Sequence, residues 1–484
     1  MAPPHRGLAQ AGSAAQAPLQ TDFTKARISA ELDRIIPGLL VAGDVPGIQI
    51  AVIKDGQIIL NRGFGVVSAA TKAPVTESTV FEAASLSKPV FAYAVLKLVD
   101  QGKLELDKPL SQYLEKPYVE GDDRLKLITA RRVLTHTTGL PNWRPNRKPL
   151  KIMIQPGSRF SYSGEGFVYL QKVVERLSGK PLEELMKSMV FDPLGMTSSS
   201  YVWQTRYEAL KAIGHDGGGN PTELRRPTQA NAAASLQTTS QDYAKFVIAV
   251  MNGVGLKDST SAAMLTPQIS VEEGCRNCIF VPEPGKLSTS LSWGLGVGLQ
   301  KTNDGVAFWH WGDNEDVHCY MLGYPRQKIG IVVFTNSGYG HAIIPEVITQ
   351  TIGGYQPAYA WIAYEHYNSP IKNFYHAVLT QGIVAVDEYR EQRKRKTNVD
   401  LEEEQMSRLG HWLQTGNHLR EAIEVFKLNS EIYPGSWNAF DSLGEAYMAD
   451  GDKTDAIKSY EQAVKLNPNN VNGIEMLRSL RSKD

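Results

Sequence analysis

Strand-like segments occur at two widely separated places in the chain. The first is a pair of runs rich in β-branched residues, 47–53 and 57–63, with Asp55-Gly56 between them, and Asp-Gly is a strong hairpin signal. Strand-like runs return much later, at 293–300, 305–312, 317–324 and 328–336. This pattern predicts an α+β fold, in which an antiparallel sheet flanked by helices carries an inserted helical subdomain between its two groups of strands.

The intervening residues carry helical signals. Apolar residues recur at helical spacing after Ser85, and Gly102 ends that pattern. Ser85 is therefore expected at or just before a helix amino terminus, with Lys88 one turn inside the helix. Further helices are predicted within 131–143, 166–179, 181–196, 239–253 and, after the last strand, 343–352.

The carboxy-terminal part repeats itself with a period of 34 residues. The matching pairs are Leu409-Gly410 with Leu443-Gly444, Ala422 with Ala456, Phe426 with Tyr460, and Pro434 with Pro468. These residue types at these offsets resemble tetratricopeptide repeats, which are all-α. Two repeats and a closing helix would fill 403–484. Such helix pairs present a concave face that would bind a protein or peptide, and a stabilising cap or dimer surface without a ligand is an equal alternative.

Composition excludes several classes of function. The chain has 484 residues, which favours two to three domains, and its 51 Lys and Arg balance its 51 Asp and Glu. No basic stripe suggests nucleic-acid binding, and no apolar run is long enough for a transmembrane segment. The first 20 residues lack the apolar core of an intact signal peptide, so they indicate a disordered leader or the remainder of a replaced signal.

The three cysteines do not form a disulfide framework. Cys275 and Cys278 form a Cys-x-x-Cys in a loop-like stretch, and Cys319 lies in a predicted strand. A zinc site needs a second ligand pair, and none is near in the sequence. A loop disulfide or two free thiols is therefore favoured over metal or redox chemistry, and no metal or cofactor is predicted.

Ser85 and Lys88 form a Ser-x-x-Lys pair in which the two side chains would share one helix face. A serine nucleophile needs a base within hydrogen-bond reach, so this pair is a candidate for nucleophilic catalysis. The spacing alone is weak evidence, because Ser369 and Lys372 repeat it in a segment without a following apolar helix pattern.

Other candidate groups for the same chemistry lie far along the chain. Tyr162 precedes a predicted helix, His310 lies in a strand-like run, and His136 precedes Thr-Thr-Gly. Each also has a purely structural interpretation, as a buried hydrogen-bonded residue or a residue that fixes a turn. Tryptophans at 143, 309 and 311 could line an apolar acyl pocket or simply fill the core.

Eight segments occur in the order of a known family. They are "VPGIQIAVIKDGQII", "TVFEAASLSKPV", "VLTHTTGLP", "PGSRFSYSGEGF", "FDPLGMTSSS", "LQTTSQDYAKF", "HWGDNEDVH" and "IGIVVFTNS". Over residues 25 to 355 the chain resembles the serine β-lactamase and penicillin-binding-protein superfamily, in the class C-like branch that includes esterases. The resemblance implies a hydrolase domain at 25–358, which leaves the leader at 1–24, a connecting segment at 359–402 and the repeat domain at 403–484.

The resemblance also implies roles for the candidate residues. Ser85 would be the nucleophile, Lys88 would hold the proton relay, and Tyr162 would act as general base and then as acid toward the leaving group. A nearby ammonium lowers the pKa of a phenol, so a Tyr162 phenolate could take the serine proton. Whether Lys88 or Tyr162 is the formal base stays open, because interacting groups titrate together.

His310-Trp311-Gly312 stands where many relatives have Lys-Thr-Gly. The oxyanion hole would consist of the backbone N–H groups of Ser85 and Asp313, helped by the dipole of the helix that starts near Ser85.

Two departures from the family pattern bear on the substrate. Gly164 replaces the asparagine of the Tyr-x-Asn motif, and His310 replaces a lysine, so a fixed positive charge for a substrate carboxylate is missing. Both changes favour a small-molecule neutral ester or amide over a β-lactam.

The sequence therefore predicts an esterase that acts through a Ser85 acyl-enzyme and water. A D-amino-acid peptidase or carboxypeptidase, or a weak β-lactamase, is the first alternative. The second is a catalytically idle penicillin-binding scaffold whose repeats bind a partner. Relatives are usually exported, but the compartment of this chain stays open because no intact signal peptide is present.

Overall fold

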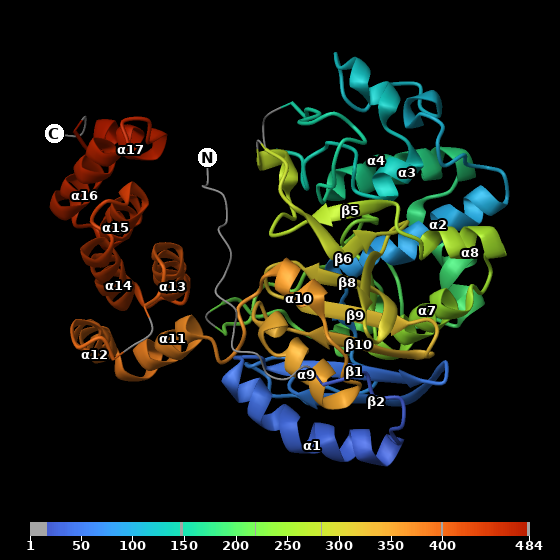
Figure 1. Cartoon of the computed structure of the whole chain (residues 1–484), viewed down its shortest axis with the longest axis horizontal. Helices are drawn as coiled ribbons and strands as arrows, with labels where there is room; N and C mark the ends of the chain where they lie inside the picture. Colours follow the sequence, from blue (N-terminus) through green and yellow to red (C-terminus); the bar gives the residue numbers. More distant parts are fainter. Residues whose placement is uncertain (1–16, 146–148, 218, 282, 398–399, 482–484) are drawn as a thin grey trace. The chain divides into compact units, whose positions relative to one another are not determined.

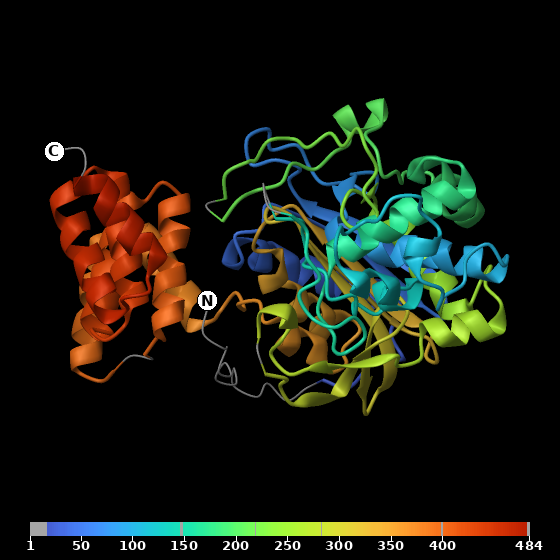
Figure 2. The same ribbon diagram turned by 90° about the horizontal axis from the view of Figure 1, so that it is seen from above.

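The computed structural model of the chain describes all residues except 1–16, 146–148, 218, 282, 398–399 and 482–484. The described chain forms two compact units, which Figures 1 and 2 show in two views. Unit 1 comprises Met1–His215 and Pro221–Tyr364, and unit 2 comprises Asp216–Asn220 and Glu365–Asp484. Among the described helices, none combines the length and the apolar character needed to cross a membrane.

Unit 1 is built on an eight-stranded sheet whose neighbouring strands are all antiparallel, which confirms the predicted α+β fold. The strand order is β2-β1-β10-β9-β8-β7-β6-β5. The strands are β1 (Gly47–Lys54), β2 (Gln57–Gly65), β5 (Ile269–Glu272), β6 (Leu287–Trp293), β7 (Gly298–Thr302), β8 (Gly305–Asp313), β9 (His318–Tyr324) and β10 (Ile329–Thr335).

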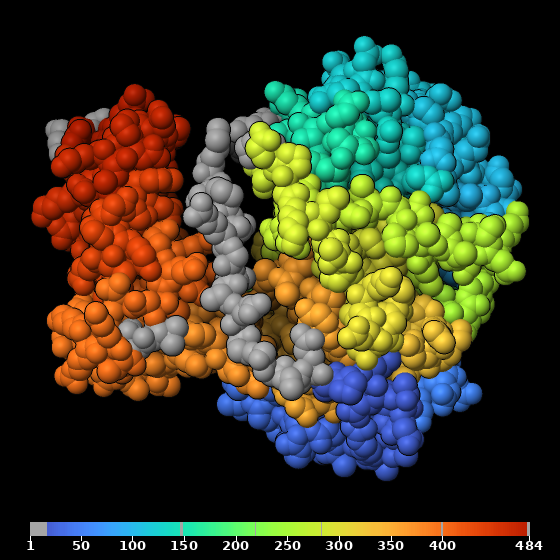
Figure 3. All heavy atoms as spheres, in the orientation of Figure 1, coloured from blue at the N-terminus to red at the C-terminus, as the bar shows by residue number. Residues whose placement is uncertain are grey.

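Both ends of unit 1 meet in this sheet. β1 pairs with β10, with Ile48 opposite Thr335, so the first and last strands of the unit are neighbours. A second sheet consists of β3 (Phe81–Glu82) and β4 (Gln237–Thr238). β3 comes just before Ser85 in the chain, and β4 lies late in the helical insertion. The cyan part of the insertion lies at the β5 end of the sheet in Figure 1 and occupies the same place in Figure 3, and the blue α1 (Lys25–Ala42) lies at the β2 end.

Helices support the sheet and carry the candidate residues. In unit 1 they are α2 (Ser87–Asp100), α3 (Ala130–Leu134), α4 (Gly164–Ser178), α5 (Leu182–Met186), α6 (Asp192–Leu194), α7 (Ser240–Asn252), α8 (Asp258–Met264), α9 (Ile344–Thr351) and α10 (Pro357–Ile362). α2 is central to the core, since nearly its whole length is buried, and α7 packs against β1, β2, β9 and β10.

The predicted strand at 293–300 is wrong. Residues 294–297 form the turn between β6 and β7, and the run of β6 before it was not predicted. Two glycines explain the turn: Gly296 has φ +89°, and a Cβ at Gly294 would lie 2.2 Å from the Met264 carbonyl oxygen. The alternation of apolar residues with glycines in 293–300 resembles the pattern of one continuous strand, which explains the wrong prediction.

Part of the predicted leader is ordered. Residues 1–16 lie outside the described residues, but the following segment is bound to the edge of unit 1. The Gln20 N–H donates to the Ile352 carbonyl over 2.8 Å, and the Leu19 N–H donates to Asp304 over 3.0 Å. The Phe23 ring is buried and lies 5.3 Å from the Lys54 ammonium. Burial of this ring gives the segment a reason to be fixed that its Ala- and Pro-rich composition conceals.

Unit 2 consists of helices that pack in antiparallel pairs (Figure 2), as expected for an all-α repeat array. They are α11 (Pro370–Gln381), α12 (Ile383–Lys394), α13 (Glu403–Thr415), α14 (Leu419–Ile432), α15 (Trp437–Asp450), α16 (Lys453–Leu466) and α17 (Val471–Arg481). The predicted connecting segment at 359–402 is thus largely helical. α11 packs against α13 and α12 packs against α14, so this segment extends the array.

The repeated residues explain the helix pairing. A Cβ at Gly410 would lie 2.4 Å from the Phe426 ring, and a Cβ at Gly444 would lie 2.9 Å from the Tyr460 ring. In each repeat a glycine on the first helix therefore lets an aromatic ring of the second helix approach closely.

Candidate active site

The Ser85 and Lys88 side chains meet at the start of α2. Ser85 lies in a short 3₁₀ turn, Ala84–Leu86, that runs directly into the helix. The Lys88 Nζ lies 2.9 Å from the Ser85 Oγ and 2.8 Å from the Ala233 carbonyl oxygen. The neighbouring Ser87 turns away, since its hydroxyl donates to the Ala84 carbonyl and accepts from the Leu236 N–H. Only Ser85 therefore presents its hydroxyl to the lysine.

The backbone before Ser85 adopts an uncommon conformation. Ala84 has φ +45°, a region that non-glycine residues rarely occupy. Tight packing holds it there: a Cβ at Gly312 of β8 would lie 3.2 Å from the Ala84 Cβ and 2.7 Å from the Ala83 carbonyl oxygen. The glycine thus lets β8 approach the segment that carries Ser85, and the strain at Ala84 is maintained by this contact.

Lys88 is completely buried among aromatic rings. Its Nζ lies 4.8 Å from the ring centroid of Tyr162, 5.7 Å from that of Trp143 and 5.9 Å from that of Phe167. Burial lowers the pKa of Lys88 well below its usual value, because the charged form loses its hydration. Among the described residues, the Lys88 nitrogen is hydrogen-bonded to the serine hydroxyl and the backbone carbonyl and to no carboxylate. The neutral amine is therefore favoured at a lower pH than for an ordinary lysine.

Tyr162 lies just before α4 and faces the same space. Its N–H donates to the Arg276 carbonyl over 2.8 Å, and its ring lies 4.3 Å from His136 and 4.7 Å from Trp311. Its buried hydroxyl has no partner in good hydrogen-bond geometry among the described residues. Burial raises the pKa of Tyr162, and the nearby Ser85 hydroxyl offsets that rise only in part. The phenol is consequently protonated, in contrast to the phenolate considered from sequence.

His136 and His310 are buried and neutral. The His136 Nδ1 accepts from the Ser163 N–H over 3.0 Å, and His136 itself has φ +53°, so it fixes the turn before α4. The His310 Nδ1 lies 2.7 Å from the Trp311 carbonyl oxygen. Burial, helped by the charge of Lys88, lowers the pKa of His310 to about 3. Neither ring supplies a positive charge at neutral pH.

Gly164 begins α4 directly after the Ser163 cap. A Cβ there would lie 2.9 Å from the Asn142 carbonyl oxygen and 3.0 Å from the Trp143 indole. Trp143 therefore occupies the direction in which a side chain at 164 would extend. It is 45% exposed and forms an open aromatic wall beside Lys88, whereas Trp309 is completely buried in the core.

Asp313 ends β8 and its carboxylate is strongly held. One oxygen lies 3.3 Å from the His318 Nε2 and accepts from the Glu315 N–H over 2.8 Å, and the other accepts from the Tyr364 hydroxyl. Burial alone would raise the pKa of Asp313, but these contacts outweigh it and hold the pKa well below the usual range. The side chain is thus fixed, and with it the backbone at the end of β8.

Sequence reasoning missed several groups that complete this region. The Ala233 and Arg276 carbonyls are backbone groups and leave no signal in the residue type. Tyr364 lies beyond the predicted hydrolase boundary at 358, although its hydroxyl contacts Asp313. The sequence shows a tyrosine at this position, but its contact with Asp313 depends on the path of the chain after α10.

The cysteine loop lies beside Tyr162. Cys275 and Cys278 form a disulfide, which is one of the two favoured interpretations of the sequence. Glu272 lies within 4.8 Å of both sulfur atoms, and this is the one cluster with metal-ligand composition in the described part of the chain. Its carboxylate already pairs with Arg159 over 2.7 Å, and the sulfurs bond to each other. The cluster therefore has no ligand atoms to spare.

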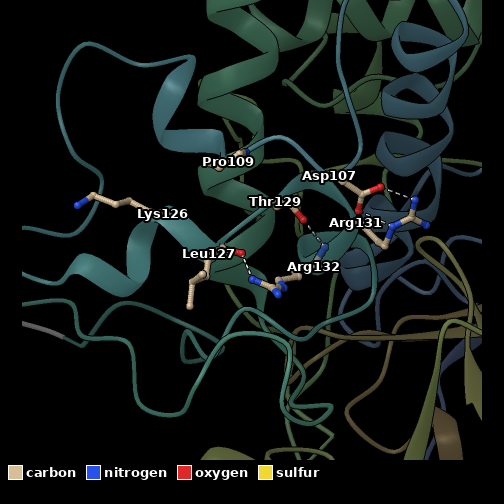
Figure 4. Close-up of a pocket in the computed structure, with 7 residues that line it drawn as sticks. All are labelled: Asp107, Pro109, Lys126, Leu127, Thr129, Arg131 and Arg132. Carbon is tan, nitrogen blue, oxygen red and sulfur yellow. Dashed lines mark hydrogen bonds and ion pairs between the residues drawn. The ribbon is translucent and has the colours of Figure 1, made fainter.

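A cavity of about 380 Å³ opens on the surface of unit 1, away from these residues (Figure 4). Its charged groups are satisfied locally, since Arg131 pairs with Asp107 over 2.7 Å and Arg132 donates to the Leu127 carbonyl. It contains none of the candidate catalytic side chains. Its lining residues are Asp107, Pro109, Lys126, Leu127, Thr129, Arg131 and Arg132.

Comparison with known proteins identifies the family of the chain. The family model described as "Beta-lactamase" matches residues 32–348. The chain belongs to the β-lactamase family. A second model, "Tetratricopeptide repeat", matches residues 437–470, so the prediction of a carboxy-terminal tetratricopeptide repeat is confirmed.

Curated relatives of this β-lactamase-family chain include an esterase. "Protein flp" of Staphylococcus aureus is 24% identical over 345 residues, which is 66% of this chain and 66% of the relative, slightly under two thirds of its length. "Esterase EstB" of Burkholderia gladioli is 30% identical over 240 residues, covering 43% of this chain and 60% of the relative.

Solved structures share the fold. The octameric penicillin-binding protein homologue from Pyrococcus abyssi has a TM-score of 0.55 at 23% identity, covering 72% of this chain and 81% of its own. A class C β-lactamase has a TM-score of 0.57 at 21% identity, covering 69% of this chain and 97% of its own. At these identities the likeness establishes the β-lactamase and penicillin-binding-protein fold.

Proposed function

We propose that unit 1 is a serine hydrolase that cleaves small neutral esters through a Ser85 acyl-enzyme. The observation that carries the proposal is the distance of 2.9 Å between the Lys88 Nζ and the Ser85 Oγ inside a buried aromatic site. A serine hydroxyl becomes an effective nucleophile when a base of this kind lies within hydrogen-bond reach.

In the proposed reaction, neutral Lys88 accepts the Ser85 proton as Oγ attacks the acyl carbon. The C–O bond of the ester then breaks, the acyl group stays on Ser85, and the Tyr162 hydroxyl gives its proton to the leaving alkoxide. The Lys88 ammonium returns a proton to Tyr162, which restores both groups. Water then attacks the acyl carbon and gives a proton to Lys88. The bond between that carbon and the Ser85 Oγ breaks, Lys88 returns the proton to Oγ, and the acid is released. The lowered pKa of Lys88 and the raised pKa of Tyr162 support this assignment of base and acid.

The developing oxyanion would be bound by the backbone N–H groups of Ser85 and Asp313. The close approach of β8 to the Ser85 segment at Gly312 supports this arrangement. Donors aimed at developing charge are worth about 10²- to 10³-fold in kcat each.

Three features support an ester as the substrate. His310 carries no charge to attract a substrate carboxylate, because burial lowers its pKa to about 3. Gly164 supplies no side-chain amide for a peptide or β-lactam group, and Trp143 offers an apolar wall in that place. The relative with 30% identity is named an esterase.

Fluorophosphonate labelling and ester kinetics test the proposal. Ser85→Ala should abolish labelling and lower turnover of a p-nitrophenyl ester by about 10⁴- to 10⁶-fold. Ser369→Ala is a matched control, since Ser369 belongs to the other Ser-x-x-Lys and caps α11, and both labelling and turnover should persist in it. Retained labelling in a folded Ser85→Ala variant would reject Ser85 as the nucleophile. Faster turnover of nitrocefin than of every ester in a panel would reject the substrate class.

For unit 2 we propose that the repeats bind a protein or peptide segment. The support is the match to the tetratricopeptide family, whose stacked helix pairs provide a concave face. An affinity measurement between purified unit 2 and candidate segments, with a scrambled segment as control, tests this role.

A further inference from the structure

The peptide bond between Gly312 and Asp313 is held from its carbonyl side by a buried histidine. The His341 Nε2 lies 3.1 Å from the Gly312 carbonyl oxygen. A carbonyl can only accept, so this nitrogen carries the proton. His341 is buried, and burial together with the neighbouring His318 lowers its pKa well below the usual value, so it donates as a neutral imidazole.

This contact and the pairing of Gly312 with Cys319 in β9 together fix the direction of the Asp313 N–H. The described chain contains no cis peptide bond, and in a trans peptide the C=O and the following N–H point to opposite sides. Since the Gly312 C=O points to His341, the Asp313 N–H points away from it. A Cβ at Gly312 would lie 2.7 Å from the Ala83 carbonyl oxygen and 3.2 Å from the Ala84 Cβ, so this peptide also lies next to the segment that precedes Ser85.

The position of His341 is itself determined by neighbouring contacts. It lies in a 3₁₀ turn, Gly340–Ala342, and a Cβ at Gly340 would lie 1.8 Å from the Thr335 Oγ1. The His341 N–H donates to the His318 Nδ1 over 3.2 Å, which leaves the His318 Nε2–H to face the Asp313 carboxylate. The two histidines thus hold the carbonyl of residue 312 and the side chain of residue 313.

We infer that His341 is a positioning residue for the oxyanion hole: its Nε2–H orients and polarises the Gly312–Asp313 peptide so that the Asp313 N–H becomes a stronger donor to the substrate oxyanion. A hydrogen bond accepted by an amide carbonyl strengthens the hydrogen bond that the same amide donates, by about 10–30%. This inference rests on the proposed function, because it concerns the same acyl-transfer site.

Kinetics of substituted proteins test the effect on rate. His341→Leu should lower kcat for ester acylation by about 3- to 10-fold with little change in KM, as a fraction of the 10²- to 10³-fold worth of one whole donor. His341→Gln, whose amide can donate to the same carbonyl, should recover most of the loss. His215→Gln is the control for loss of a buried histidine, because the His215 ring binds the Ala69 N–H and the Asn336 carbonyl instead.

A trifluoromethyl ketone that forms a hemiketal with Ser85 provides a readout that a merely structural role would not move. ¹³C NMR of the adduct follows ionisation of its oxyanion, which should require a higher pH in His341→Leu than in the wild type and in His341→Gln. Ionisation at an unchanged pH in a folded His341→Leu protein would overturn the inference.

Two further outcomes remain decisive. If His341→Leu does not fold, His341→Phe keeps an aromatic ring against Tyr364 without a donor and replaces it in both measurements. If neither variant folds, the amide proton of Asp313 is followed by ¹H NMR in the wild-type protein. Its signal must shift downfield when the adduct forms, and an unchanged signal overturns the inference. A wild type that forms no adduct and takes no fluorophosphonate label contradicts the proposed function itself.

Discussion

The Trp143 indole lies directly in the path of any side chain at Gly164, with two of its ring carbons 3.0 Å from where a Cβ would stand. The backbone of Gly164 is ordinary helix, and the nearest atoms that oppose a larger residue belong to this ring and to the Asn142 carbonyl. The family's Tyr-x-Asn motif and a tryptophan in this position are therefore mutually exclusive alternatives for the same space.

Restoring the asparagine should succeed only when the indole is removed. Gly164→Asn alone should lower ester turnover and the melting temperature, because overpacking of this kind costs about 1–3 kcal/mol. The double variant Gly164→Asn with Trp143→Ala should recover stability and gain about 3- to 10-fold on amide-bearing substrates relative to Trp143→Ala alone, which is the worth of one added hydrogen bond. The measurement is kcat/KM on an aryl ester and on nitrocefin, with melting curves for all four proteins. Independent effects of the two substitutions would contradict the shared space.

The pH profile should report Lys88. The proposed reaction needs the neutral amine, and burial lowers the pKa of Lys88, so kcat/KM should rise with pH and level off below the ordinary range for lysine. Trp143→Glu places a negative charge near the ammonium, which favours the charged form and should move the rising limb to higher pH. At a fixed pH on that limb the rate should fall about tenfold, since one charge at this range is worth about 1–2 kcal/mol.

Trp143→Gln is the matched control for this experiment, with similar size and no charge. Its rising limb should coincide with that of the wild type. A limb that moves equally in the Glu and Gln variants would show that the titrating group is not Lys88.

Tyr162→Phe should separate stability from activity. The buried Tyr162 hydroxyl lacks a partner in the described residues, so its removal should leave the melting temperature unchanged or raise it. Hydrolysis of alkyl esters should fall by about 10²- to 10⁴-fold, while p-nitrophenyl esters, whose leaving group needs no proton, should lose much less. Tyr169→Phe in α4 removes another buried hydroxyl without a partner and should leave activity unchanged. Equal losses on both ester types would contradict a proton donor.

The carboxy-terminal boundary of the hydrolase can be tested by two truncations. A chain that ends after Tyr364 should keep most ester hydrolysis, because it retains all of unit 1. A chain that ends at 358, the boundary expected from sequence, loses Tyr364 and Trp361, whose indole N–H donates to the Glu272 carbonyl over 2.7 Å. The loss of these side chains leaves a cavity in the core, which destabilises a protein. That shorter chain should therefore lose at least tenfold in kcat or become insoluble. Equal activity of the two would place the boundary at 358.

Much of this site was predictable because its signals are local. Ser85 and Lys88 are three residues apart, in a 3₁₀ turn and in the first turn of the helix that follows it, and that spacing brings their side chains together. The electrostatics were not predictable, because the shifts at Lys88 and Tyr162 come from burial by rings distributed over the chain. Backbone partners such as the Ala233 and Arg276 carbonyls carry no residue signature. The boundary of β6 and β7 was missed because glycines interrupt an otherwise strand-like pattern.

The pairing of β1 with β10 cannot form until late in the synthesis of the chain. β1 emerges from the ribosome first, yet its partner follows roughly 280 residues later, which takes about 15–60 s at ordinary rates of synthesis. Through that interval an apolar strand, buried at seven successive positions in the finished protein, has only the β2 hairpin beside it, and a lone hairpin is marginally stable. Unpaired strands of this kind recruit other chains, so chaperone supply should limit soluble yield. A circular permutant that begins after β2 and makes β1 immediately after β10 would remove the wait while keeping every contact of the sheet.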